Sequence, residues 1–417
     1  MTRIYFHMLA LEAAKLVSLA PESIDVGPFA EFDTRQFREF WQTLVRRIWS
    51  QWRYTHRRPD YLGPSFRTRG RTGGGTPVRF DATSSCVLNM CGGGKDSLVT
   101  MKLLEESGIP FCSYAYSHSV YGEAEFQHSL IDRLLDEGQP RKRHKHWVND
   151  SLLRKHGNSE FKSSEIIAAE TPCAVIGALP VMLHEGYEFL TVGHERSANK
   201  GNVIWNETGE DVNHQWGKSF AAETVLNEYI TSELVAGVRY FSLLQQIHDV
   251  TIFNALRDHR GALEHTHSCN VSKPWCKRCP KCAYVWLNYM AYLSIDQVAS
   301  MFEENLFDME CNQEWFAGML GLREHTPFEC IGQVPEAKLA FEMCKAKGVR
   351  GRAMDLYVDE VGKVSVQSIV AEYTNIGSDL HQVPHSIEAR IRPLLRRYSR
   401  QAKQHICNHL LPEFATV

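Results

Sequence analysis

Apolar and aromatic side chains recur at three- and four-residue steps between Phe32 and Trp52, and this spacing predicts a helix. The positions that carry the stripe are Phe37, Phe40, Trp41, Leu44, Ile48 and Trp52. From Arg53 to Pro77 the periodicity stops, because a stretch rich in arginine, glycine and proline breaks regular structure. It contains Arg57, Arg58, Arg67, Arg69, Arg71 and Gly73 to Gly75. We therefore predict a helical N-terminal extension and linker over residues 1–80.

Short apolar runs alternate with helical runs after the linker. Strands are predicted at Cys86 to Met90, Phe111 to Tyr116 and Glu188 to Val192, and helices at Leu98 to Leu104, Phe126 to Leu135, Ala174 to His184 and Thr224 to Gln246. This alternation is typical of an α/β fold with a doubly wound parallel sheet, here spanning Asp81 to about Val192. We assign it to a domain of residues 81–265.

The rest of the chain is predicted to be helical around a cluster of cysteines. Four cysteines lie between Cys269 and Cys282, and an apolar helix is expected from Tyr284 to Leu293. This part forms a predicted region of residues 266–345, followed by a helical C-terminal region of residues 346–417. The basic run from Ile387 to Lys403 is interpreted as the solvated face of a helix.

Composition and charge narrow the class of protein. Of the 417 residues, 43% are hydrophobic and 23% are charged, which is typical of an ordered globular chain. Lys and Arg number 46 against 49 Asp and Glu, so binding to nucleic acid or anionic lipid would require a local patch. Arg3, Glu12 and Lys15 interrupt the apolar run of a signal peptide, and no apolar window approaches about 18 residues. We expect a cytoplasmic protein without a membrane partner.

The stretch Cys91-Gly92-Gly93-Gly94-Lys95-Asp96-Ser97 joins the first predicted strand to its helix. Successive glycines let the backbone adopt positive φ and approach a ligand closely, so that N–H groups and the helix N-terminus converge on an anion. A lysine adds charge, a serine hydroxyl can donate to phosphate, and an aspartate can hold Mg²⁺. We predict a phosphate-binding loop formed by Gly92, Gly93, Gly94, Lys95, Asp96 and Ser97. The alternative is a glycine-rich turn in which Asp96 or Ser97 only caps the helix.

Cys269, Cys276, Cys279 and Cys282 follow the spacing C-x6-C-x2-C-x2-C. Four thiolates in so short a stretch match a tetrahedral Zn²⁺ site, and flanking lysine and arginine side chains favour the thiolate form. Four protein ligands leave no open position, so we predict a structural zinc. An iron–sulfur cluster is the main alternative, because three cysteines at x2 spacing also suit one.

Two polar stretches lie between the predicted sheet and the cysteines. His194, Glu195 and Arg196 follow the third predicted strand, and His214 and Lys218 belong to the second stretch. Ligands bind beyond the carboxyl ends of strands in an open α/β sheet, so the first stretch is expected to face the same crevice as the phosphate loop. For any one of these residues a polar surface loop is the alternative. Together they favour a substrate site.

The glycine loop has neither Walker spacing nor the spacing of the dinucleotide fingerprint. It resembles the Ser-Gly-Gly-x-Asp-Ser loop of the ATP pyrophosphatase, or PP-loop, superfamily, with Gly92 where serine is usual. The resemblance implies a doubly wound α/β domain that binds ATP and Mg²⁺, cleaves ATP between its α and β phosphates and adenylates an acceptor. It also implies that the adenine meets the end of the next strand, near Cys112 to Ser117.

Five stretches carry a closer resemblance: Gly93 to Ser97, Val192 to Asn199, Asn213 to Ser219, Trp275 to Cys282 and Pro327 to Gly332. They resemble the bacterial UDP-N-acetylmuramoyl-L-alanyl-L-glutamate epimerase family over roughly Asp81 to Gly332. The resemblance implies an isomerase that uses ATP to invert the terminal L-glutamate of a peptidoglycan precursor, with release of AMP and pyrophosphate. The implied partner is a small nucleotide-linked peptide rather than a nucleic acid.

The chemistry of such a reaction can be argued from the residues. An ionised carboxylate makes its neighbouring Cα–H very weakly acidic, and adenylation removes that obstacle. One group then takes the proton, a second returns one from the opposite face, and water hydrolyses the acyl-adenylate. The candidates for proton transfer are His194, Glu195, His214 and Lys218, and the sequence leaves the pair open. Arg196 is a candidate to bind a substrate carboxylate or phosphate.

Three other functions stay open from the sequence. A PP-loop enzyme resembling the cyano-deazaguanine synthases would also activate a carboxylate and carry a four-cysteine zinc site. An RNA-modifying PP-loop protein would use the basic stretches Arg46 to Arg71 and Arg141 to His146, although such patches are more often solvated. A non-catalytic nucleotide-binding protein is favoured by Gly92, while Lys95, Asp96 and Ser97 argue against it.

Overall fold

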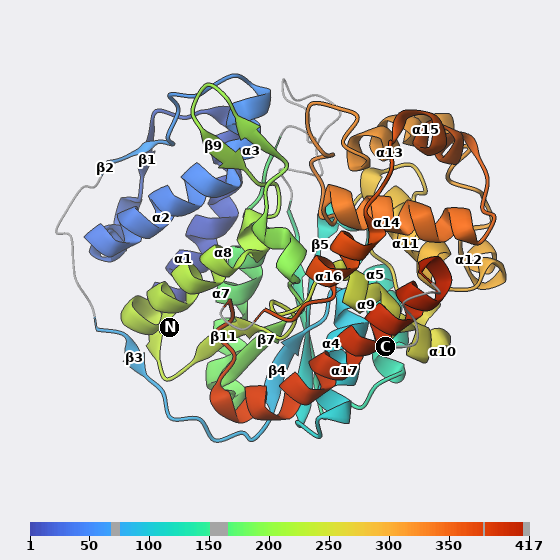
Figure 1. Ribbon diagram of the computed structural model, residues 1–417. Helices are drawn as coiled ribbons and strands as arrows, with labels where there is room; N and C mark the ends of the chain where they lie inside the picture. Colours follow the sequence, from blue (N-terminus) through green and yellow to red (C-terminus); the bar gives the residue numbers. More distant parts are fainter. Residues whose placement is uncertain (68–75, 151–165, 378–379, 412–417) are drawn as a thin grey trace.

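The structure is a computed structural model, and it describes residues 1–67, 76–150, 166–377 and 380–411. Its centre is a five-stranded sheet with the order β11-β7-β4-β5-β6 (Figure 1). The strands are β4 (Val87–Met90), β5 (Phe111–His118), β6 (Arg143–Val148), β7 (Phe189–Val192) and β11 (Arg239–Ser242). All four pairings between them are parallel. The predicted parallel α/β sheet is therefore confirmed.

Alternate side chains of the strands enter two different cores. In β4, Val87 belongs to one buried hydrophobic cluster and Leu88 to the other, and in β11 Tyr240 and Phe241 divide in the same way. A strand buried on both faces is apolar at consecutive positions, which explains the short apolar runs of the sequence. The sheet thus carries a hydrophobic layer on each face.

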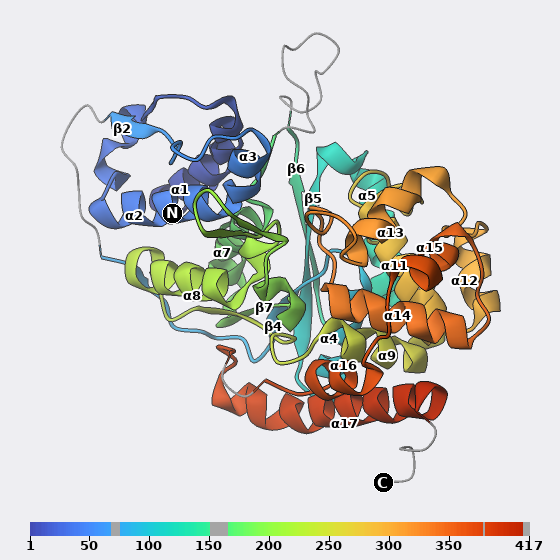
Figure 2. The same cartoon turned by 45° about the horizontal axis from the view of Figure 1, so that its top comes forward.

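Helices cover both faces of the sheet (Figure 1). On one side lie α4 (Lys95–Glu106), α5 (Ala124–Asp136), α9 (Asp249–Ala255) and α17 (His385–Leu410). On the other lie α1 (Thr2–Ala13), α7 (Glu170–Glu185) and α8 (Phe220–Tyr229). Figure 2 shows α17 crossing one end of the molecule against α4 and α9. A sheet covered on both faces is the doubly wound arrangement expected from the sequence.

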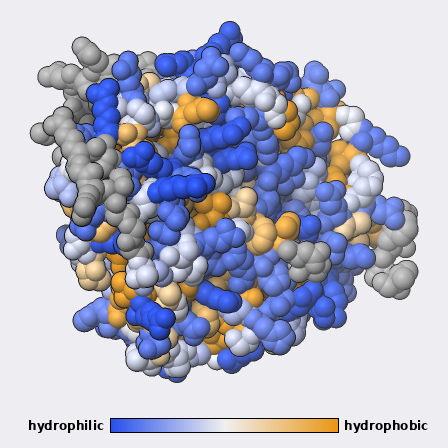
Figure 3. All heavy atoms as spheres, turned by 90° about the vertical axis from the view of Figure 1, so that its left-hand side faces the viewer, coloured by the Kyte–Doolittle hydropathy of each residue, from blue (hydrophilic) through white to orange (hydrophobic). Residues whose placement is uncertain are grey.

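The N-terminal extension packs against the second face of the sheet. The predicted helix is present as α2 (Arg35–Ile48), capped by Thr34, whose Oγ1 accepts from the Phe37 N–H at 3.0 Å, and α3 (Ser50–Thr55). The rings of Phe40 and Tyr229 stack with centroids 3.9 Å apart, joining α2 to α8. The surface visible on this side is largely hydrophilic with scattered apolar side chains (Figure 3). Arg69, Arg71 and Gly73 to Gly75 lie outside the described residues.

The predicted helix from Thr224 to Gln246 is wrong in its second half. The helix α8 ends at Tyr229, a π turn follows over Ile230–Leu234, and the chain then forms β10 (Val235–Ala236) and β11. Gly237 has φ +104, and a Cβ there would lie 2.2 Å from the carbonyl oxygen of Phe80, so the chain cannot continue as a helix. The sheet consequently extends to Ser242 instead of ending near Val192.

The basic stretch from Arg141 to His146 contributes to β6, an edge strand that the sequence did not predict. Two of its charges are paired with the neighbouring helix α5, and Lys142 pairs with Glu185 of α7. Lys145 Nζ lies 2.5 Å from Asp132 Oδ2, and Arg143 Nη2 lies 2.8 Å from Asp136 Oδ1. Pairing with carboxylates explains why this stretch is basic without requiring a nucleic acid.

The C-terminal half is helical, as expected, and it completes the first core. Its helices are α10 (Arg260–Leu263), α11 (Pro280–Tyr292), α12 (Ile295–Phe302), α13 (Gln313–Met319), α14 (Val334–Ala346), α15 (Arg352–Glu360), α16 (Val366–Tyr373) and α17. The hydrophobic cluster on this side contains residues from both sides of the predicted boundary at 265, and the domain boundaries stay a prediction. Within the described ranges, no helix has the length and apolar character to cross a membrane.

The remaining strands form small two-stranded sheets at the periphery. They pair β1 (Ser23–Asp25) with β2 (Ser65–Arg67), β3 (Val78–Arg79) with β10, and β8 (Val203–Trp205) with β9 (Glu210–Val212). The hairpin β8–β9 lies between the two predicted polar stretches. It returns the chain toward the sheet, so that the second stretch follows directly on the first in space.

Candidate active site

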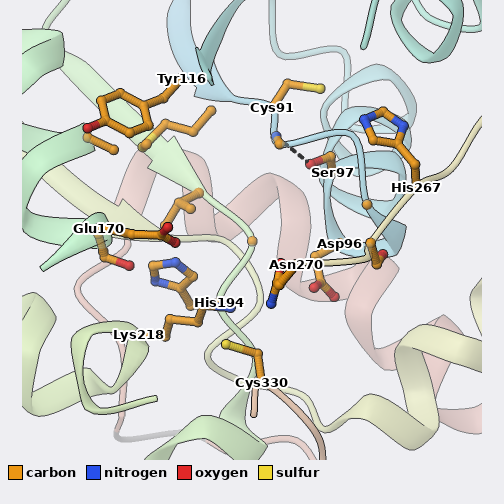
Figure 4. Close-up of a pocket in the computed structure, with 18 of the residues that line it drawn as sticks. Cys91, Asp96, Ser97, Tyr116, Glu170, His194, Lys218, His267, Asn270 and Cys330 are labelled. Atoms are coloured by element: carbon orange, nitrogen blue, oxygen red, sulfur yellow. Dashed lines mark hydrogen bonds between the residues drawn. The ribbon is translucent and has the colours of Figure 1, made fainter. Parts of the chain in front are cut away.

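The direction of the strand order reverses beside β4, which pairs with β5 on one side and β7 on the other. In an open α/β sheet, such a switch point opens a crevice beyond the carboxyl ends of the strands. A cavity of about 250 Å³ lies there, lined by the phosphate loop after β4 and by Gly193 and His194 after β7 (Figure 4). The structure therefore brings together the loop and the first polar stretch.

The phosphate loop is held by a segment far away in the chain. Gly93 has φ +82, and its carbonyl oxygen accepts from the N–H of His267 at 2.8 Å. A Cβ at position 93 would lie 2.1 Å from the His267 ring. At Gly92, by contrast, a built Cβ has no heavy atom of the described chain within 4 Å. Packing therefore requires glycine at position 93 and would accept a larger residue at position 92.

The N-terminus of α4 points into the cavity without a side-chain cap from the described residues. Ser97 Oγ accepts from the N–H of Gly92 at 3.0 Å, which closes the loop on itself. Neither Asp96 nor Ser97 caps the helix, in contrast to the alternative interpretation of the sequence. Uncapped N–H groups and the positive end of the helix dipole are the features by which helix N-termini bind anions.

Lys95 does not line this cavity. Its ammonium lies beneath the loop and donates to Asp96 Oδ1 at 2.6 Å and to Asp249 Oδ1 at 2.5 Å. Although burial opposes the charge, the carboxylates of Asp249 and Asp96 hold the pKa of Lys95 well above its usual range. The sequence predicted Lys95 as a positive charge of the phosphate-binding loop, and in the structure this charge is paired with two carboxylates below the loop.

Asp96, Glu195 and Asp249 form a group of carboxylates whose oxygens lie within 4.8 Å of one another. Burial and the charge of Asp249 raise the pKa of Glu195 to about 7. Tyr284 donates to Asp249 Oδ2 at 2.9 Å, which orients this carboxylate. Carboxylate oxygens are the ligands that Mg²⁺ prefers, but the Lys95 ammonium lies between Asp96 and Asp249, and of the three carboxylates only Asp96 lines the cavity. Asp249 was missed because it lies at the start of α9, outside every motif.

His194 lines the cavity, and its Nδ1 lies 3.3 Å from the hydroxyl of Tyr240. Burial and the nearby charge of Lys218 hold the pKa of His194 well below its usual range, so the ring is neutral. Arg196 is not among the residues that line the cavity as described. A Cβ built on Gly377 would lie 3.0 Å from Arg196 Nη1, so its guanidinium points to the segment before α17.

The second polar stretch reaches the same cavity through Lys218. His214 lies behind it, and a residue that the sequence analysis did not single out, Cys330, lines the cavity beside Lys218 (Figure 4). Cys330 belongs to one of the stretches that resemble the epimerase family, but a single cysteine between a glutamate and an isoleucine carries no recognisable chemistry in the sequence. Only the fold places Cys330 near Lys218 and His214.

The four predicted metal ligands converge. Cys269 and Cys279 have their Sγ atoms 3.8 Å apart, Cys276 and Cys282 have theirs 3.9 Å apart, and all four lie within 4.8 Å of one another. For a zinc–sulfur bond of about 2.3 Å, a tetrahedron of thiolates has an edge of about 3.8 Å. The donor set therefore fits a single tetrahedral ion. A four-iron cluster, with one thiolate on each iron, requires a wider spacing.

The segment from His267 to Cys282, which we call the cysteine loop, also supplies residues to the cavity. Five of its side chains line the cavity: His267, Ser268, Asn270, Lys273 and Lys281. The sequence analysis used the lysines of this loop only to explain the thiolates. Their positions show that a metal site here would hold cationic groups next to the phosphate loop.

Two parts of the chain match models of the MurL epimerase family. The MurL N-terminal domain matches residues 172–243, and the MurL C-terminal domain matches residues 263–368. The first match contains the two polar stretches, and the second contains the cysteine cluster and Cys330. Both matches thus fall on segments that line the cavity.

Proteins named UDP-N-acetyl-alpha-D-muramoyl-L-alanyl-L-glutamate epimerase are similar to this chain. The protein from Salinispora tropica is 26% identical over 277 residues, which cover 64% of this chain and 57% of the relative. That from Micromonospora is 28% identical, covering 64% and 59%, and that from Xanthomonas oryzae is 27% identical, covering 61% and 56%. The match thus spans less than three fifths of each relative's length.

Among solved structures, the U34-tRNA thiolase NcsA from Methanococcus maripaludis with its [4Fe-4S] cluster is similar at 16% identity, covering 66% of this chain and 81% of the thiolase. The TM-score is 0.28, which is too low for any conclusion about the fold or the metal.

Proposed function

We propose that this protein is an ATP-dependent epimerase that inverts the terminal L-glutamate of a UDP-N-acetylmuramoyl-L-Ala-L-Glu-type peptide. The observation that carries the proposal is the convergence of the phosphate loop, the two polar stretches and the cysteine loop on one cavity. The names of the similar proteins support the choice of reaction. ATP is a substrate of the proposed reaction, and AMP and pyrophosphate are its products.

Activation of the carboxylate is the first step. The N–H groups of the loop and the end of α4 would bind the departing pyrophosphate, and Lys273 and Lys281 add positive charge to the same cavity. Of the three carboxylates Asp96, Glu195 and Asp249, only Asp96 lines the cavity, and it would hold Mg²⁺, which neutralises charge on the phosphates when bound. Lys95 keeps these carboxylates from repelling one another.

Proton transfer at the α-carbon is the second step, and it requires groups on both faces of that carbon. Lys218 and His194 line the cavity, whereas Arg196 and His214 lie behind its wall. Lys218 is cationic, because Cys330 and Glu195 raise its pKa against the effect of burial, so it suits the oxygen of the enolate rather than the proton. The neutral ring of His194 is suited to exchange a proton.

The proposal is tested by following AMP, pyrophosphate and the configuration of glutamate in one reaction. With ATP, Mg²⁺ and a glutamate-terminated UDP-linked peptide we expect all three products, and Asp96→Ala should lower their rate at least 100-fold. Asp258→Ala, an exposed aspartate of the same chain, is the matched control. Release of ADP, stimulation by RNA, or unchanged turnover of Asp96→Ala would overturn the proposal.

The same assay separates the alternative functions. An amidating PP-loop enzyme would require ammonium and release AMP without a D-glutamate product. A non-catalytic nucleotide-binding protein would bind ATP without releasing AMP. An RNA-modifying role has little support, since Arg46 and Arg53 lie against Glu210 and the basic residues of β6 lie against α5. The observations favour a small-molecule substrate.

A further inference from the structure

We infer that Cys330 is a proton-transfer residue of this site, activated by His214 and Lys218, and that Gln51 of the N-terminal extension is the positioning residue that orients His214. The inference rests on the proposed function, because it names one of the two groups that exchange the α-proton. It goes beyond that proposal, since no motif or family match joins Cys330, His214 and Gln51 in one role.

Cys330 is fixed by its backbone while its side chain stays free to react. Its N–H donates to Glu329 Oε1 at 2.7 Å, and its carbonyl oxygen accepts from the ammonium of Lys281. The side chain lines the cavity, and Figure 4 shows the sulfur directed toward Lys218 and away from the phosphate loop. Cys330 and the phosphate loop line the same cavity, so a substrate with its phosphates on the loop would lie within the cavity that the thiol faces.

His214 is oriented by a residue from the opposite end of the chain. Its Nδ1 lies 2.6 Å from Oε1 of Gln51 in α3, and an amide oxygen only accepts, so Nδ1 carries the proton. The other nitrogen, Nε2, lies 4.0 Å from Glu329 Oε1. A ring nitrogen of His214, a Glu329 oxygen and Cys330 Sγ lie within 4.8 Å of one another. In this tautomer Nε2 can accept the proton of the thiol.

The helix α3 is itself held against the loop that carries Cys330. Tyr54 donates to Glu324 Oε1 at 2.9 Å, and its ring packs edge-on against Phe328 with centroids 5.8 Å apart. Arg53 Nη1 donates to Glu210 Oε2 at 2.8 Å, which ties α3 to the hairpin before His214. The N-terminal extension therefore supplies Gln51 to the site. This gives a role in the reaction to a region for which the sequence suggested no function.

The charges around Cys330 favour its thiolate. Burial and Glu329 oppose ionisation, but Lys218 and His214 outweigh them and lower the pKa of the thiol. The reciprocal effect appears on His214, whose pKa is raised by Cys330 and Glu329 despite burial. A lower pKa increases the fraction of thiolate at a given pH, and the thiolate is the form of cysteine that acts as a base.

The proposed step balances without an oxidant or reductant. The thiolate of Cys330 takes the proton from Cα, so that an S–H bond forms as the C–H bond breaks and the electron pair moves to the carbonyl oxygen of the acyl-adenylate. A second acid on the opposite face then gives a proton to Cα, the electron pair returns from the carbonyl oxygen to form the new C–H bond, and that acid is reprotonated from solvent. Water then cleaves the acyl-adenylate to carboxylate and AMP, and the thiol loses its proton to His214 and solvent. The reverse reaction uses the same two groups in the opposite order.

The first test separates activation from proton transfer. In Cys330→Ser we expect AMP release with the glutamate-terminated peptide to stay within about threefold of wild type, while formation of the D epimer falls by about 100-fold or more. Cys311→Ser, an exposed cysteine, is the control and should match wild type. Epimer formation by Cys330→Ser near the wild-type rate, or equal loss of AMP and epimer in a folded variant, would overturn the inference. Absence of AMP in the wild type would instead overturn the proposed function.

The second test does not depend on catalysis. At pH 6.5, iodoacetamide should label Cys330 of the full-length protein at least tenfold faster than Cys311, as read by mass spectrometry of the two peptides. His214→Ala and Lys218→Met should remove this difference. Gln51→Ala should shift the pH profile of labelling upward, and Gln51→Glu, which still accepts from Nδ1, should restore it. Equal labelling of the two cysteines in the wild type would overturn the inference, whatever the protein catalyses.

Discussion

The ammonium of Lys95 and Oδ1 of Asp249 lie 2.5 Å apart, although 154 residues separate them in the chain. Both side chains are 2% exposed. The pair joins the first residue of α4 to the first residue of α9, below the floor of the cavity. It holds the phosphate loop to the core and cancels charge in the group of Asp96, Glu195 and Asp249.

Removing the cation of this pair should destabilise the protein strongly. Lys95→Met leaves the carboxylates of Asp249, Asp96 and Glu195 together without compensation, so we expect the free energy of unfolding to fall by about 3–5 kcal/mol. Urea unfolding measures the change. Arg35→Met, which removes an exposed ion pair with Glu39, should change it by less than about 1 kcal/mol. A loss as small as that of Arg35→Met would show that the buried pair contributes little.

Substitution of the glycine loop should leave ATP binding intact at Gly92 and weaken it at Gly93. Gly93→Ala places a methyl group 2.1 Å from the His267 ring at a positive φ, so ATP binding should weaken at least tenfold. Gly92→Ser meets open space and should bind ATP as well as wild type or better, because a hydroxyl can reach the phosphates. Calorimetric titration with ATP and Mg²⁺ compares them. Equal affinities of the two variants would argue against an ATP site on this loop.

The cysteine cluster should bind one zinc ion per chain, as measured by elemental analysis. Cys282→Ser should lose the metal and also weaken ATP binding. The metal fixes Cys269, which lies two residues after His267, and the His267 N–H donates to the carbonyl oxygen of Gly93 in the phosphate loop. Cys311→Ser should retain both. Visible absorbance from iron, or full zinc content in Cys282→Ser, would contradict the assignment.

The buried carboxyl of Glu223 should make stability depend on pH. Burial raises the pKa of Glu223 from 4.5 to about 8, so between these values the folded state keeps a proton that the unfolded chain has lost. The free energy of unfolding should therefore decrease from pH 5 to pH 8, by on the order of 4 kcal/mol from this group. Glu223→Gln removes that contribution, and the exposed Glu228→Gln on the same helix keeps it. Urea unfolding of the three proteins at both pH values checks the difference, and parallel behaviour would contradict it.

Local features of the fold could be read from the sequence because their causes are local. The strand, glycine turn and helix around Gly93 arise from periodicity and backbone freedom over about twenty residues. The four cysteines converge because few residues separate them. The helix predicted beyond Tyr229 failed for the opposite reason, since the contact that excludes it is with Phe80, more than 150 residues earlier.

By itself, the sequence determined three strands of the central sheet, several of the helices around it, and the positions of the glycine loop and of the cysteine cluster. Only the tertiary structure decided that Lys95 lies beneath the loop, that Arg196 points away from the cavity, and that Asp249, Cys330 and Gln51 belong to the site. These residues meet because the two cores pack around one sheet and bring together side chains that no local pattern relates. Hydrophobic burial sets that packing over the whole chain, so the partners of a charged or reactive group depend on the complete fold.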